Sequence, residues 1–215
     1  RILVIRRKAV GDVMVSLPVL RALRERWPGA RIDFVVDRFV SPAVRDHPSL
    51  DRVLSYDRTL SGEGPLLRRA RATRMWLRRL RDQGYDLVLD LMGTPQTAVW
   101  TWATGAPVRV GRMRRWRSWA YTEVLPPDEG VRFAGEVFLD WVRALGFEPA
   151  PWSPEPLARP AEVDEAVAVE MERHRATGHP VVILNPSASW SAKAWPWPWN
   201  VSEFYWRRTT NDLRT

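Results

Sequence analysis

The sequence predicts an α/β fold built on a mainly parallel sheet, because short apolar strands alternate with helical stretches along the chain. The first unit runs from a strand at residues 2–5, through a helical stretch that opens at Asp12, to a second strand at residues 32–36. Residues 87–91 and 108–110 form two further apolar runs of the same kind. Strand, crossover helix and strand together make parallel sheets. We therefore expect these segments to be neighbouring strands of one sheet, with Asp12 at its carboxyl edge.

The helices are predicted from apolar residues that recur at about 3.6-residue spacing. After Asp12, apolar side chains share one face from Val13 to Leu23, and Pro18 indicates either a kink or a helix that begins there. Further helices are expected over residues 41–47, 66–83, 98–104, 133–145 and 161–177, with Gly84, Gly105 and Gly146 ending three of them, and a short strand is expected at residues 53–54.

Prolines mark the expected domain boundary. Residues 149–160 contain five of them, which indicates a linker or a surface crossing. We expect a Rossmann-like domain over residues 1–155, a linker and connecting helix over residues 156–180, and the start of a second domain at residues 181–215. That second part opens with an apolar strand at residues 181–184 and ends in a tryptophan-rich tail with no clear period.

Composition excludes several kinds of chemistry. The chain has no cysteine and only three histidines, none with a partner at metal-ligand spacing, so thiolate catalysis, disulfides and a zinc site are not expected. No apolar run reaches the roughly 18 residues that span a bilayer, and the first strand is too short for a signal peptide, so the cytoplasm is the expected compartment. The net charge of +8 comes almost entirely from arginine. Arginine pairs with phosphate and carboxylate, which favours an anionic partner, although a solvated surface from an arginine-biased genome explains it equally well.

Three stretches carry a resemblance to a known family. The first strand leads into Gly11-Asp12 and a Leu17-Pro18 helix. The second stretch is Tyr85 to Gly93, followed by Gly105-Ala106 and Arg109-Val110-Gly111, and the third is Asn185 to Trp190, followed by Lys193-Ala194-Trp195-Pro196. In this order they resemble glycosyltransferase family 9, the heptosyltransferases of the lipopolysaccharide inner core. Asn185 and Ser187 depart from the family pattern, and the resemblance stops after Pro196.

The resemblance implies the N-terminal half of a GT-B architecture with an incomplete second domain. In such proteins the first Rossmann-like domain binds the acceptor and the second binds a nucleotide sugar, here expected to be ADP-heptose, with no metal or other cofactor. It further implies that Asp12 is the base that takes a proton from the acceptor hydroxyl. From its position alone, Asp12 is better suited to cap a helix N-terminus than to act as a base.

Other candidate site residues follow from the same resemblance. Lys8, Gly11 and Gly93 are expected on the acceptor side, where Lys8 suits a phosphate or carboxylate and Gly11 lets the backbone approach a ligand. The alternatives are a solvated cation and a tight turn. Ser187, Ser189 and Lys193 are expected to hold the donor diphosphate, the alternative being an ordinary surface loop.

Two basic stretches remain. Seven arginines and no acid lie between residues 68 and 81, interleaved with leucine and tryptophan, and five more arginines lie between residues 109 and 117. A basic amphipathic helix suits an anionic membrane surface or an acidic glycan. A solvated face and nucleic-acid binding are alternatives, but no nucleic-acid-binding motif accompanies the arginines.

The expected activity is therefore transfer of heptose or a similar sugar to an acidic lipopolysaccharide-core acceptor near the inner membrane. With its donor half incomplete, the 215-residue chain is expected to be inactive by itself. A non-catalytic acidic-glycan or membrane-binding protein is the main alternative, and a nucleic-acid-binding protein is less favoured.

Overall fold

The computed structural model describes residues 1–57, 65–112, 115–128, 130–155, 161–175 and 178. The chain divides into two compact units, Arg1–Arg159 and Pro160–Thr215. The predicted strand at residues 181–184 and the tail after it lie outside the described residues.

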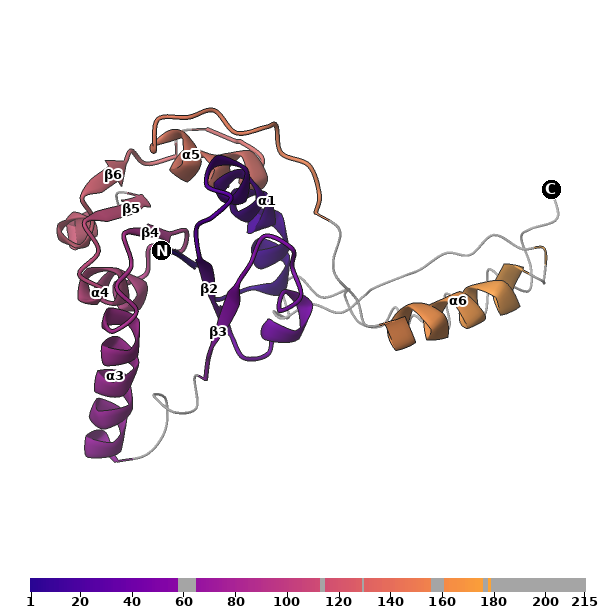
Figure 1. Cartoon of the computed structure of the whole chain (residues 1–215), viewed down its shortest axis with the longest axis horizontal. Coiled ribbons are helices and arrows are strands. Elements are labelled where there is room, and N and C mark those ends of the chain that lie inside the picture. The colour runs from indigo at the N-terminus through magenta and orange to yellow at the C-terminus, as the bar shows by residue number, and fades with distance from the viewer. Residues whose placement is uncertain (58–64, 113–114, 129, 156–160, 176–177, 179–215) are drawn as a thin grey trace, which may run out of the picture. The chain divides into compact units, whose positions relative to one another are not determined.

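The first unit contains a six-stranded, entirely parallel sheet (Figure 1). Its strands lie in the order β3-β2-β1-β4-β5-β6. Their bounds are β1 Ile2–Ile5, β2 Ile32–Asp37, β3 Arg52–Tyr56, β4 Leu87–Asp90, β5 Val108–Arg112 and β6 Glu123–Leu125. The predicted parallel arrangement is confirmed, and β6 is an edge strand that the sequence pattern did not indicate.

The helices of this unit follow the predicted pattern with shifted ends. They are α1 Val10–Arg26, the 3-10 turn η1 Ser41–Ala43, α3 Leu66–Arg81, α4 Pro95–Ala103, the 3-10 helix η2 Arg115–Ala120 and α5 Ala134–Arg143. In the second unit, α6 spans Ala161–Arg175. The expected helix at residues 41–47 is only a single turn. By contrast, α4 starts earlier than expected because Thr94 caps it and Pro95 occupies its first position.

The start of α1 differs from the prediction in a way that matters for the site. The helix begins at Val10, before Asp12, and runs without interruption through Pro18. Asp12 is therefore the third residue of the helix, and Ala9 is its N-cap. The expectations that a loop reaches Gly11, and that the helix opens at Asp12 or at Pro18, were wrong.

Apolar side chains cover both faces of the sheet, as expected for a parallel sheet with crossover helices. Because side chains alternate along a strand, Ile2 and Val4 face the helices α1 and α5, whereas Leu3 and Ile5 face α3 and α4. Trp76 and Leu80 of α3 and Trp100 of α4 fill the core on the second face.

The strand order reverses at the centre of the sheet, because β2 and β3 lie to one side of β1 while β4, β5 and β6 lie to the other. Ile5 and Asp90, the last residues of the neighbouring strands β1 and β4, are partners in the register. From there β1 leads to α1 on one face, while β4 leads to α4 on the other. In open α/β sheets, ligands bind at the carboxyl edge where the chain diverges in this way.

Candidate active site

Asp12 lies at this edge of the sheet, in the first turn of α1. Its side chain is 49% exposed. Its carboxylate accepts a hydrogen bond from the backbone N–H of Ala9 at 3.3 Å, and a negative charge here is favourable for the helix dipole. Asp12 thus supports the start of the helix from the third position and is not its N-cap. An exposed carboxylate remains available to a ligand.

Arg6 holds this carboxylate in place. Its Nη2 atom lies 2.6 Å from Oδ2 of Asp12, and its own side chain is only 14% exposed. Its Nη1 atom donates to the carbonyl oxygen of Leu91 at 3.1 Å, and its guanidinium lies 5.0 Å from the ring centroid of Phe138. Arg6 therefore connects the first strand, the end of β4, α5 and Asp12.

A fully buried carboxylate, Asp90, orders the loop that follows β4. Its Oδ1 atom accepts the backbone N–H groups of Met92 and Gly93, each at 3.0 Å, and its Oδ2 atom accepts the hydroxyl of Tyr121 at 2.8 Å. Burial raises the pKa of Asp90, and these hydrogen bonds act in the opposite direction. Gly93 has a φ of +61°, a conformation that strongly favours glycine. The loop beside Asp12 is thus built on a fixed frame.

The glycine of the Arg109-Val110-Gly111 motif has a packing role in this frame. A Cβ atom added at Gly111 would lie 2.4 Å from the ring of Tyr121, which is far inside van der Waals contact. Glycine at this position lets the buried Tyr121 pack against β5 and reach Asp90.

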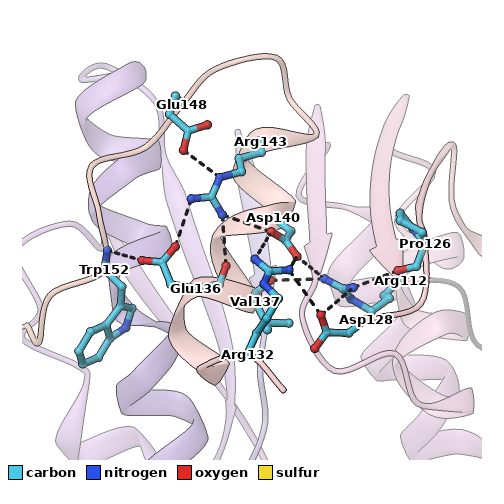
Figure 2. Close-up of polar contacts among 10 residues, drawn as sticks. All are labelled: Arg112, Pro126, Asp128, Arg132, Glu136, Val137, Asp140, Arg143, Glu148 and Trp152. Carbon is cyan, nitrogen blue, oxygen red and sulfur yellow. Dashed lines mark hydrogen bonds and ion pairs between the residues drawn. The ribbon is translucent and has the colours of Figure 1, made fainter. Parts of the chain in front are cut away.

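A cluster of charges attaches α5 to the end of β5 (Figure 2). Asp140 accepts hydrogen bonds from three arginines: Arg112 at 2.7 Å, Arg132 at 2.9 and 3.0 Å, and Arg143 at 3.2 Å. Arg112 also donates to the carbonyl oxygen of Pro126 and lies over the ring of Trp141 at 4.8 Å. Partial burial acts to raise the pKa of Asp140, but the arginines outweigh it and the pKa is lowered.

This cluster supports the candidate site because α5 carries two of its contacts. Trp141 donates its indole N–H to the carbonyl oxygen of Asp90 at 3.0 Å, and Phe138 packs against Arg6. This cluster was not predicted from the sequence. The spacing of Arg132 and Arg143 around Asp140 was a local signal for it, but the contribution of Arg112 depends on the fold.

Two of the other predicted acceptor-side residues, Lys8 and Gly11, lie near Asp12 along the chain. Lys8 is exposed between β1 and α1. Gly11 is exposed in the first turn of α1, with no positive φ and no atom within 4 Å of an added Cβ, so it does not form a tight turn. Gly93 belongs to the loop that Arg6 contacts through Leu91.

The donor-side residues Ser187, Ser189 and Lys193 lie outside the described residues. Among the residues that the structure describes, no cluster suited to a metal ion occurs.

The two basic stretches have different structures. All seven α3 arginines are exposed. In the second stretch, however, Arg112 is buried, and Arg109 donates to the carbonyl oxygens of Ala106 and Ala120. Interpreting residues 109–117 as one basic surface was therefore wrong for these two arginines. No helix in the described part of the chain is long and apolar enough to cross a membrane.

The open parallel sheet has the α/β architecture in which ligands commonly bind at the carboxyl edge. Residues 73–200 match the family model of glycosyltransferase family 9 (heptosyltransferase), which is more than half of the chain. The chain belongs to this family.

Individual relatives agree with this assignment. The chain is 26% identical over 214 residues to lipopolysaccharide heptosyltransferase 1 of Pseudomonas aeruginosa, a match that covers 96% of this chain and 56% of that protein. The E. coli heptosyltransferase WaaC, solved with ADP, has a similar fold, with a TM-score of 0.67, 20% identity, and coverage of 97% of this chain and 62% of WaaC. A family 9 glycosyltransferase from Veillonella parvula gives a TM-score of 0.66 at 20% identity, over 91% of this chain and 56% of that one. The chain thus spans slightly more than half the length of the curated relative.

Proposed function

We propose that the protein transfers heptose, or a similar sugar, from a nucleotide-sugar donor to an acidic lipopolysaccharide-core acceptor. Membership of family 9 supports this proposal. The observation that carries it is the position of Asp12, an exposed carboxylate held by Arg6 at the point where β1 and β4 diverge. This is the edge where an open α/β sheet binds its ligand.

In the proposed reaction, a hydroxyl of the acceptor attacks the anomeric carbon of the donor sugar. Asp12 accepts the hydroxyl proton as the new carbon–oxygen bond forms, and the bond to the nucleotide diphosphate breaks, so that the diphosphate leaves with the bonding electrons. Arg6 keeps the carboxylate oriented, because it is itself fixed by Leu91 and Phe138. Lys8 is placed to attract an anionic group of the acceptor, and the backbone at Gly11 leaves space for it.

On the donor side, we propose that Ser187 and Ser189 bind the diphosphate and that Lys193 offsets the charge that develops on it. ADP-heptose is the proposed donor. The E. coli WaaC structures, one with ADP and one with ADP-2-deoxy-2-fluoro heptose, support this choice by family likeness. Because the chain spans 56% of the P. aeruginosa protein, the activity is proposed for the whole protein.

The proposed acceptor also suggests where the protein works. An acidic glycolipid is presented at a membrane surface, so we propose that the protein acts as a peripheral protein on the cytoplasmic side of the inner membrane. The arginines of α3 are consistent with an anionic partner of this kind. Nucleic acid remains a disfavoured partner.

The test is a transfer assay with ADP-heptose and a phosphorylated lipopolysaccharide-core acceptor, followed by mass spectrometry of the acceptor. The whole protein is expected to add one heptose to each acceptor, and Asp12→Asn is expected to abolish most of this activity. Acceptor binding without transfer by the whole protein would favour a non-catalytic glycan-binding role. The absence of both acceptor binding and heptose transfer would refute the proposal.

A further inference from the structure

The N-terminal half of α3 is exposed in the described structure. Every residue from Pro65 to Arg71 is exposed, and the large apolar side chains Leu66, Leu67 and Met75 are 79%, 86% and 63% exposed. Among the described residues, the buried side chains of this helix, Trp76 and Leu80, lie in its C-terminal half. Figure 1 shows the first turns of α3 extending past the strands. Exposed leucines at a helix end indicate a surface that is covered in the functional state.

The charge on the same turns restricts what can cover them. The helix Leu66–Arg81 contains seven arginines and no acid. Arg68, Arg71 and Arg74 form no ion pair with the described residues, and the i,i+4 pair of Arg78 with Asp82 is long, at 3.6 Å. Like charges at this spacing repel one another and destabilise an isolated helix. An anionic partner removes this repulsion, and the exposed leucines require that the partner also has an apolar part.

Exposed tryptophans also lie on α4 and η2. The helix α4 packs against α3, and η2 packs against α4. Trp102 of α4 is 57% exposed, and Trp116 and Trp119 of η2 are 66% and 46% exposed. The rings of Trp102 and Trp119 contact each other edge to face at 6.0 Å. Tryptophan favours the boundary between water and lipid, because its ring is apolar while its N–H needs a polar partner.

We infer that a docking surface, formed by Leu66, Leu67, Arg68, Arg71 and Arg74 of α3, binds an anionic phospholipid bilayer. Phospholipid headgroups match the arginines, and the acyl region matches the leucines. A nucleic acid would meet the arginines but would leave the leucines exposed. The inference rests on the proposed function only in that a lipid-linked acceptor requires work at a membrane.

The test uses the 215-residue chain and vesicles that contain neither acceptor nor sugar donor. The chain is expected to float with vesicles of phosphatidylglycerol and phosphatidylcholine in roughly equal amounts, and not with phosphatidylcholine alone, with binding that weakens as salt is added. Equal recovery on both kinds of vesicle would overturn the inference. So would binding to duplex DNA or RNA that is tighter than binding to the anionic vesicles under the same conditions.

Matched variants locate the surface. Arg68→Gln/Arg71→Gln/Arg74→Gln is expected to weaken vesicle binding by on the order of 100-fold, the loss expected for three arginines near an anionic surface. The control Arg26→Gln/Arg38→Gln/Arg45→Gln removes the same charge from exposed positions outside α3 and should change binding by less than about threefold. Leu66→Ser/Leu67→Ser should also weaken binding, whereas Phe39→Ser/Val131→Ser, which alters two other exposed apolar residues, should not. Equal losses in the test and control variants would contradict the assignment.

A direct measurement does not depend on those variants. Because the chain has no cysteine, Leu67→Cys and Val131→Cys each provide a single site for an environment-sensitive fluorophore. On anionic vesicles the label at position 67 is expected to shift to the blue, and the label at position 131 is expected to stay in water. A label at position 67 that remains in water while the chain is bound would overturn the inference. Transfer activity is measured separately, so vesicle binding without activity would count against the proposed function alone.

Discussion

Arg6 and Asp12 form an ion pair of 2.6 Å at the central carboxyl edge of the sheet, and Arg6 is the less exposed of the two. The pair joins an exposed carboxylate to a guanidinium that is itself held by Leu91 and Phe138. This relationship explains how an aspartate in the first turn of a helix can present a constant geometry to an acceptor hydroxyl.

Replacing Arg6 tests this relationship. In the whole protein, Arg6→Met should lower kcat by about 10- to 100-fold with little change in KM, because a misplaced base slows the chemical step more than it weakens binding. Arg6→Lys should recover part of the rate, since one ammonium can reach Asp12 but cannot also reproduce the fork to Leu91. Steady-state kinetics of both variants check this expectation. An unchanged kcat in Arg6→Met would show that Asp12 needs no positioning by Arg6.

Gly11 separates a structural role from a binding role. An added Cβ meets no atom within 4 Å, so Gly11→Ala should fold normally and be more stable by about 0.4–1 kcal/mol, because alanine reduces the entropy of the unfolded chain. If the backbone at Gly11 contacts the acceptor, the same variant should raise the acceptor KM. Urea denaturation and acceptor titrations measure the two effects. A stable variant with unchanged KM would remove Gly11 from the acceptor site.

Gly111 should behave in the opposite way. Gly111→Ala should destabilise the fold by about 1–3 kcal/mol, because the new methyl group overlaps the buried ring of Tyr121. Gly29→Ala is the control, since an added Cβ there meets nothing within 4 Å and its cost should stay within about 0.5 kcal/mol. Equal melting temperatures for the two variants would argue against the packing of Tyr121 on β5.

The Asp140 cluster predicts a dependence of stability on pH. The pKa of Asp140 is lowered from its ordinary value of 3.8. The contribution of its ionised carboxylate to the free energy of unfolding is therefore complete above that value, and it is lost as pH falls through the lower, folded-state pKa. Asp140→Asn should therefore cost about 2–4 kcal/mol at about pH 7, because it leaves Arg112 buried with a weaker partner, and less at about pH 3.

Urea denaturation at the two pH values measures this difference. Asp82→Asn is the matched control, because Asp82 is 62% exposed and its pair with Arg78 is expected to contribute little. A cost for Asp140→Asn that does not change between the two pH values would contradict the role of its charge.

The sequence predicted the parts of the fold that local patterns determine. The apolar runs located β1, β2, β4 and β5, and the alternation of strands and helices identified the parallel sheet. The edge strand β6 was missed, because Glu123 and Val124 are exposed and its three residues form no apolar run. The start of α1 was misplaced, because Asp12 is typical of an N-cap while Ala9 is not.

Contacts between distant parts of the chain could not be predicted from local patterns. The hydrogen bond from Tyr121 to Asp90 joins residues 31 positions apart, and the bond from Arg6 to Leu91 joins residues 85 positions apart. Asp12 could be proposed as a site residue from its motif and its position after β1, but the arginine that orients it depends on where β4 and α5 lie.

The proposed role of Asp12 as the catalytic base is tested most directly by Asp12→Asn in the whole protein. Asparagine retains the shape and an oxygen that can accept the Ala9 N–H, so the melting temperature and the acceptor affinity should change little. Heptose transfer should fall by on the order of 100-fold or more, which is the usual contribution of general-base assistance. A variant that transfers heptose at nearly the wild-type rate but melts earlier would show that Asp12 supports the helix and that the base lies elsewhere.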